Sequence, residues 1–125
     1  MDRKTAEHLR SAVEMCGFDF DEIISRHTNK RDYTDLRSII WTILQDETGD
    51  SALTIGRHFG WNRTTVFCSI KKARELKEYD RTFRDFYDSV YGYYINFESA
   101  ESYEEIRHDE NEHEGVGETL DEQTG

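Results

Sequence analysis

The chain has 125 residues, which is enough for one small domain with an appendage. Its hydrophobic share of 35% and aromatic share of 13% argue against a fully disordered chain and predict a core rich in rings. With Cys16 and Cys68 as its two cysteines, the chain has neither a disulfide framework nor a cysteine-rich zinc site. The opening MDRKTAEHLRSAVEM is too charged for a signal peptide, and no apolar run reaches the roughly 18 residues of a membrane span. We therefore expect a cytoplasmic protein that does not enter a membrane.

The formal net charge of −11 is unevenly distributed along the chain. Residues 98–125 contain 11 acidic residues and one basic residue, whereas residues 1–97 contain 16 acidic and 15 basic residues. Within that nearly neutral part, residues 51–77 hold six basic residues and one acidic residue. We expect a folded domain over 1–97 that carries a basic segment, followed by a disordered acidic tail over 98–125.

Apolar residues recur at helical spacing from residue 4 onward, and no strand-like alternation persists, so we expect an all-α fold. The first expected helix covers residues 4–16 and ends at Gly17. A second helix follows Asp19, a suitable N-cap residue. The third has Asp32 as its expected cap, carries a strong amphipathic stripe and ends at Gly49.

A pair of short helices is expected next. The first covers residues 51–59, and Gly60 then permits a left-handed turn. The second has Asn62 as its cap and runs to about Lys77. We expect its apolar side to consist of Val66, Phe67, Ile70 and Ala73. Two helices joined by a short turn with glycine are typical of a helix-turn-helix, which we place at about 51–77.

The last expected helix is long and aromatic. Asp80 is its expected cap, and Gly92 interrupts its pattern and weakens the prediction of a continuous helix. Its stripe consists of Phe83, Phe86, Tyr87, Val90, Tyr94 and Phe97. The seven aromatic residues in FRDFYDSVYGYYINF exceed what one stripe buries comfortably, so this helix is also a candidate homodimer contact.

The segment SALTIGRHFGWNRTTVFCSIKKAREL resembles the signature segment of the C-terminal DNA-binding domain of DnaA, the bacterial replication initiator. Ile55-Gly56, Phe59-Gly60 and Thr64-Thr65-Val66 have the order and spacing of that family, and KRDYTDLRSIIWTIL is similar to its upstream basic segment. The resemblance covers roughly residues 18–90 and is most specific at 53–73. It implies a Trp-repressor-like helical fold that binds double-stranded DNA, with the first turn of the second helix against base edges.

The resemblance also implies roles for individual residues. Those expected to contact bases are Asn62, Arg63, Thr64 and Thr65, and those expected to contact phosphates are Lys30, Arg31, Arg37 and Arg57. Apart from the resemblance, we expect Lys71 and Lys72 to contact phosphates because they are basic and lie further along the same helix. Asn62 and Arg63 stand where the family has aspartate and histidine, so its recognition site does not transfer. Asn29 stands where the family has an arginine that reaches the minor groove.

The residue chemistry supports this interpretation but leaves alternatives open. Threonine offers a donor, an acceptor and a methyl group on a short stem, and Arg63 can bind guanine through two hydrogen bonds. Thr64 and Thr65 are equally compatible with simple capping beside Asn62. Taken alone, the basic run from Lys71 to Lys77 favours a solvated helix face over phosphate contacts.

The sequence contains neither a phosphate-binding loop that ends in lysine and serine or threonine, nor a persuasive catalytic triad or dyad. We therefore expect no enzyme activity, no cofactor and no metal, and we interpret His108 and His113 as part of a solvated tail. The leading hypothesis is sequence-specific binding of double-stranded DNA by an accessory replication, transcription or mobile-element protein. The alternative is a protein-interaction module that uses the aromatic last helix. For the tail, solubility, self-inhibition and recruitment of a basic partner remain open.

Overall fold

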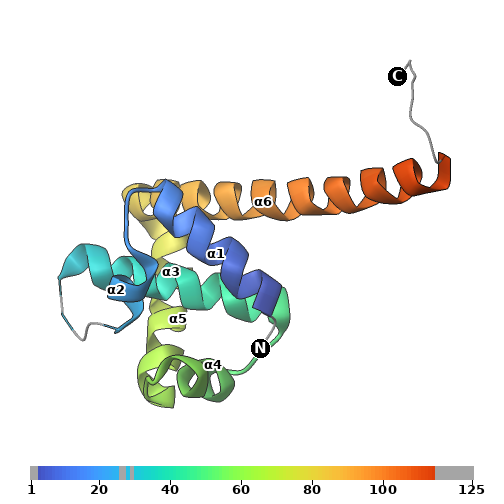
Figure 1. Ribbon diagram of the computed structural model, residues 1–125. Coiled ribbons are helices and arrows are strands. Elements are labelled where there is room, and N and C mark those ends of the chain that lie inside the picture. The colour runs from blue at the N-terminus through green and yellow to red at the C-terminus, as the bar shows by residue number, and fades with distance from the viewer. Residues whose placement is uncertain (1–2, 26–27, 29, 115–125) are drawn as a thin grey trace. The chain divides into compact units, whose positions relative to one another are not determined.

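A computed structural model describes residues 3–25, 28 and 30–114, with side chains as far as residue 100 (Figure 1). Within these ranges all regular structure is helical, so the all-α expectation is confirmed. The helices are α1 (Arg3–Met15), α2 (Phe20–Ser25), α3 (Arg31–Thr48), α4 (Ala52–Phe59), α5 (Arg63–Tyr79) and α6 (Arg81–Glu114). None of them combines the length and the hydropathy that a helix needs to cross a bilayer.

The chain divides into two units, residues 1–94 and residues 95–125. The first contains α1 to α5 and the first part of α6, and it holds the core. The second contains the rest of α6, which ends at Glu114. Residues 98–114 are therefore helical, which differs from the expected disorder. The stretch from 95 to 114 lacks glycine and proline and is rich in glutamate, a good helix former. Residues 115–125 of the expected tail lie outside the described residues.

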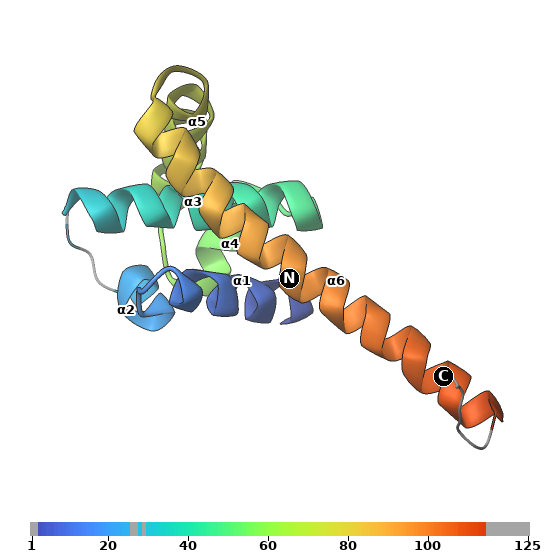
Figure 2. The same cartoon turned by 90° about the horizontal axis from the view of Figure 1, so that it is seen from above.

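Helix α3 is the centre of the first unit. It packs against α1, α2, α4 and α5, and Figure 2 shows it between α1 and α2 on one side and α5 on the other. A helix that is covered on all sides has to bury consecutive residues rather than one stripe. The nine consecutive buried residues are Leu36, Arg37, Ser38, Ile39, Ile40, Trp41, Thr42, Ile43 and Leu44. Helices α4 and α5 both pack against this central helix.

The caps of the helices agree with the sequence in most places. Asp19 and Asp80 cap α2 and α6 as expected, and each accepts a hydrogen bond from the main-chain N–H three residues later (3.2 and 3.1 Å). The expected cap Asp32 is wrong by two positions, because Lys30 is the N-cap of α3 and makes no side-chain capping bond. Asp32 lies instead in the first turn, where its negative charge faces the positive end of the helix dipole.

The first part of α6 completes the core. Phe83, Tyr87, Val90 and Tyr94 are all buried (0–3% exposed), so most of the aromatic stripe packs within the first unit. The helix continues through Gly92, where an added Cβ would meet no atom within 4 Å. These four side chains are therefore not available on the surface for a second copy.

Candidate nucleic-acid interface

The turn between α4 and α5 requires glycine at two positions. Gly60 ends α4 in the left-handed conformation at a φ of 77°. The N–H of Trp61 donates to the carbonyl oxygen of Gly56 at 2.8 Å, which folds the turn back onto α4. A Cβ on Gly56 would lie 2.5 Å from the carbonyl oxygen of Trp61, so only glycine permits this approach.

Trp61 holds the turn in place through contacts with α2 and α3. Its indole N–H donates to the carbonyl oxygen of Ile24 in α2 at 2.7 Å. Its ring lies edge to face with Trp41 of α3, with the ring centroids 5.3 Å apart. The guanidinium carbon of Arg37 lies 4.7 Å from the centre of the Trp61 ring. The position of the turn, and of the first residues of α5, is thus set by contacts to α2 and α3.

Arg37 belongs to this anchor and not to the surface. The side chain is 5% exposed, and its guanidinium donates to the carbonyl oxygens of Ile23 (3.3 Å) and Thr28 (2.8 Å). Burial lowers the pKa of this guanidinium from its ordinary value. We do not retain Arg37 among the expected phosphate contacts. Arg37 lies within LRSIIW, among the apolar residues of α3. This position was the signal in the sequence that indicated burial.

The tip of α5, residues 62–65, faces outward. Asn62 is the N-cap as expected, and its Oδ1 accepts a hydrogen bond from the N–H of Thr64 at 2.7 Å. Arg63, Thr64 and Thr65 are all exposed. Within the part of the chain that the structure describes, neither threonine hydroxyl makes an intramolecular hydrogen bond. Asn62 therefore performs the capping, and the fold assigns no bond to the hydroxyl groups of the two threonines.

The expected phosphate-binding residues of α4 and α5 are exposed: Arg57, Lys71 and Lys72. Among the described residues, Arg57 and Lys71 make no ion pair. Arg74 differs, because it bonds to Asp46 of α3 at 2.9 Å. That ion pair ties α5 to α3, so Arg74 serves the packing of the two helices.

The start of α3 carries two exposed cations, one of which reaches the C-terminal end of α5. Arg31 is 77% exposed and forms ion pairs with Asp35 (3.5 Å) and Asp80 (3.8 Å). Burial raises the pKa of Asp35, and the charges of Arg31 and Lys72 oppose that rise. Arg31 and Lys72 thus lie close enough to act on the same carboxylate. Lys30 is exposed beside them in sequence, with its ammonium 6.0 Å from the centre of the α3 tyrosine ring.

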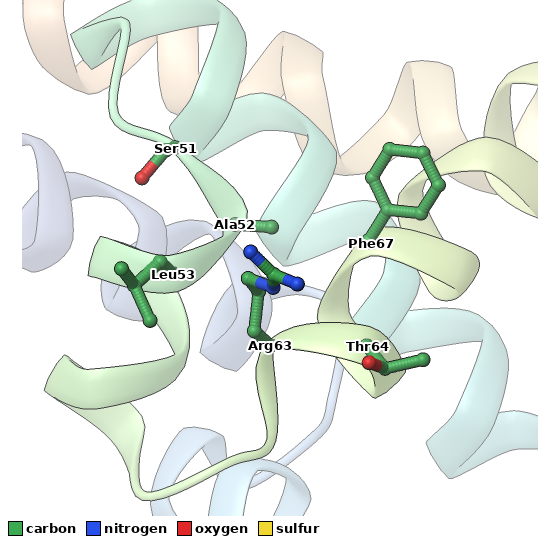
Figure 3. A pocket seen from close by; sticks show the side chains of 6 residues that line it. All are labelled: Ser51, Ala52, Leu53, Arg63, Thr64 and Phe67. Atoms are coloured by element: carbon green, nitrogen blue, oxygen red, sulfur yellow. The ribbon is translucent and has the colours of Figure 1, made fainter.

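Two large apolar side chains beside the tip are exposed, which corrects the sequence analysis. Phe67, expected on the apolar side of α5, is 59% exposed, and Leu53 of α4 is 40% exposed. One residue advances a helix by about 100°, so Phe67 turns away from the buried Val66 beside it. A hollow of about 470 Å³ lies at this place. In Figure 3 the Arg63 side chain extends between the two helices. Its lining residues are Ser51, Ala52, Leu53, Arg63, Thr64 and Phe67.

The α4–α5 pair thus presents a capped, outward helix tip with an exposed basic residue, two unbonded threonine hydroxyls and nearby lysines. Comparison of the chain with protein-family models, with curated proteins and with solved structures gives no match. The assignment of a function therefore rests on the chain's own residues and on their geometry.

Proposed function

We propose that the chain binds double-stranded DNA in a sequence-specific manner, with α4 and α5 as a helix-turn-helix and α5 as the helix that enters the major groove. The observation that carries this proposal is the exposure of Thr64 and Thr65 at the first turn of α5, with hydroxyl groups that the fold leaves unbonded. The resemblance of residues 53–73 to the DnaA signature segment supports the same function.

The tip has the groups that base recognition requires. A threonine offers a donor and an acceptor to base edges and a methyl group to thymine. Arg63 suits guanine, since a two-bond arginine–guanine contact is worth about 1–3 kcal/mol of discrimination. Asn62 uses its Oδ1 for the cap, so its side-chain NH₂ is the part that faces DNA. These four residues form the proposed base-reading set.

The exposed cations of α4, of α5 and of the start of α3 suit the phosphate backbone. We assign Arg57, Lys71 and Lys72 to phosphates because they are exposed on the two helices of the pair. Lys30 and Arg31 join them from the start of α3, where Arg31 would exchange its carboxylate partners for phosphate. Such contacts orient a protein on the duplex and add affinity without reading sequence.

These 125 residues hold no phosphate-binding loop, so we assign them DNA docking alone. The proposed setting is cytoplasmic, as an accessory protein of replication, transcription or a mobile element. The alternative function, a protein-interaction module that uses the aromatic face of α6, has less support because Phe83, Tyr87 and Tyr94 are buried within their own unit.

Selection from a pool of random duplexes at moderate salt tests the proposal. The full chain should enrich a consensus rich in the bases that threonine and arginine read. A parallel selection with a variant whose acidic residues in 98–125 are replaced by their amides removes repulsion between that segment and DNA. If neither protein enriches a consensus, sequence-specific binding is wrong and the interaction module becomes the better account.

A further inference from the structure

Two exposed apolar side chains lie together beside the tip of α5. The large hydrophobic side chains that are exposed among the described residues are Met15, Leu53, Phe67 and Tyr79. Two of these four, Leu53 and Phe67, line the same hollow although they come from different helices (Figure 3). Apolar side chains that meet at one depression are a typical sign of a binding surface, whereas single exposed ones are ordinary.

We call this hollow the Phe67 cleft and define it by Ser51, Ala52, Leu53, Arg63, Thr64 and Phe67. Its volume of about 470 Å³ lies toward the lower end of the roughly 300–1,000 Å³ of small-molecule pockets. A second hollow of about 240 Å³ also includes Phe67 in its lining, together with Gln45, Ile70, Lys71 and Arg74. Spaces of this size take one or two side chains of a partner, and Phe67 contributes to both.

The charges around the cleft define the partner's chemistry. Arg63 borders the Phe67 cleft, and Lys71 borders the second hollow, where Arg74 is already paired with Asp46. None of the described residues that line either hollow is acidic. Residues 51–77 as a whole hold six basic residues and one acidic residue. Residues 51–77 of a second copy would be repelled by this face because they bring the same basic charge, whereas an acidic segment would be attracted.

We propose that the Phe67 cleft docks an acidic segment of another protein, which inserts one large apolar side chain between Leu53 and Phe67. The carboxylates of that segment pair with Arg63 and Lys71 at the rim. Phosphates and sugars are polar and gain little from Leu53 and Phe67. Because Arg63 and Thr64 also belong to the proposed base-reading set, the acidic segment and DNA exclude each other. This exclusion rests on the proposed function, but docking itself does not.

Panning a random peptide library displayed on phage against the full chain tests the docking. The enriched peptides should share two or more carboxylates around a leucine, phenylalanine or tryptophan. Phe67→Ser and Leu53→Ser should each lower the affinity for a labelled enriched peptide by about tenfold or more. Added salt should lower that affinity further. Tyr79→Ser is the matched control, because this ring is 80% exposed but lies outside both hollows, and it should leave affinity unchanged.

Three results would overturn the proposal. Enriched peptides without the acidic and apolar pattern would show that the cleft does not select this chemistry. Equal affinity for wild type and Phe67→Ser, with thermal unfolding confirming that both are folded, would place the peptides elsewhere. Self-association of the wild type in sedimentation, abolished by Phe67→Ser, would show that a second copy is the occupant.

Docking and DNA binding can fail independently. Peptide affinity is measured without DNA, so a missing consensus in the duplex selection leaves the cleft unaffected, and failed panning leaves the DNA proposal unaffected. Where both ligands bind, the enriched peptide should displace the selected duplex from the chain. Simultaneous binding of both would overturn the exclusion of one by the other.

Discussion

Two neighbouring segments of the chain have opposite surroundings. Within residues 56–61, Gly56 and Trp61 face inward: Gly56 lies against the main chain of Trp61, and the indole N–H of Trp61 donates to the carbonyl oxygen of Ile24. Residues 62–65 turn outward, and Arg63, Thr64 and Thr65 are exposed there. Both segments lie within ten residues of sequence and share the same α4–α5 pair.

The difference separates what the fold needs from what it does not need. Gly56, Gly60 and Trp61 are constrained by the geometry of the turn and by their contacts, so their identities follow from the fold. The outward segment needs only the Asn62 cap, which bonds to the N–H of Thr64 at 2.7 Å. Two threonines and an arginine at this tip therefore call for a reason outside the chain, and base recognition supplies one.

The largest expected effect on stability is at the inward side, in Arg37→Ala. The change removes both hydrogen bonds from the carbonyl oxygens of Ile23 and Thr28 and leaves the Trp61 ring uncovered. We expect the free energy of unfolding, measured in urea, to fall by about 3 kcal/mol or more, since each buried acceptor without a donor costs about 1–3 kcal/mol. Arg31→Ala, in the same helix but 77% exposed, is the control and should change stability by less than about 0.5 kcal/mol. Similar losses for both variants would contradict the anchoring role of Arg37.

Gly56→Ala should have the next largest effect. Its Cβ would lie 2.5 Å from the carbonyl oxygen of Trp61, so the main chain of the turn must move. We expect a loss of about 1–3 kcal/mol, as for overpacked sites, measured by urea unfolding with tryptophan fluorescence.

The matched glycine is Gly92, which lies inside α6 and has open space where a Cβ would stand. Gly92→Ala should raise the free energy of unfolding by about 0.5–1 kcal/mol, because alanine favours the helix. Equal effects of the two alanine substitutions would show that the close approach at Gly56 does not hold.

The smallest expected effect is at the outer side, in Lys71→Ala. Lys71 is exposed and without an ion pair among the described residues, so its loss should leave stability nearly unchanged. The substitution should lower the affinity for the selected and the scrambled duplex alike. It should also reduce the slope of log affinity against log salt by about one. A larger loss of affinity for the selected duplex than for the scrambled duplex would show that Lys71 contacts bases and not phosphates.

The sequence predicted the features that depend on local chemistry. Helical spacing located the helices, and Asp19, Asn62 and Asp80 act as caps because an N-cap needs only a polar side chain and the next turn. The apolar stripe of α6 was predicted for the same reason, and Phe83, Tyr87, Val90 and Tyr94 are buried.

The features that depend on tertiary contacts were not predictable from spacing. Arg37 was expected at the surface, but the carbonyl oxygens of Ile23 and Thr28, distant in sequence, hold it inside. Phe67 was expected in the core, but α3 and α4 cover only the neighbouring stripe of α5 and leave its ring exposed. Neither outcome follows from one helix considered alone.

The exposed threonine pair is tested most directly by fluorescence anisotropy with wild type and with the double variant Thr64→Ala and Thr65→Ala. Each protein is measured on the selected duplex and on a scrambled duplex of the same composition. We expect the double variant to lose about 10- to 100-fold in affinity for the selected duplex, to keep its affinity for the scrambled one, and to unfold within about 0.5 kcal/mol of wild type. An equal loss on both duplexes, or no loss on either, would contradict base reading by this tip.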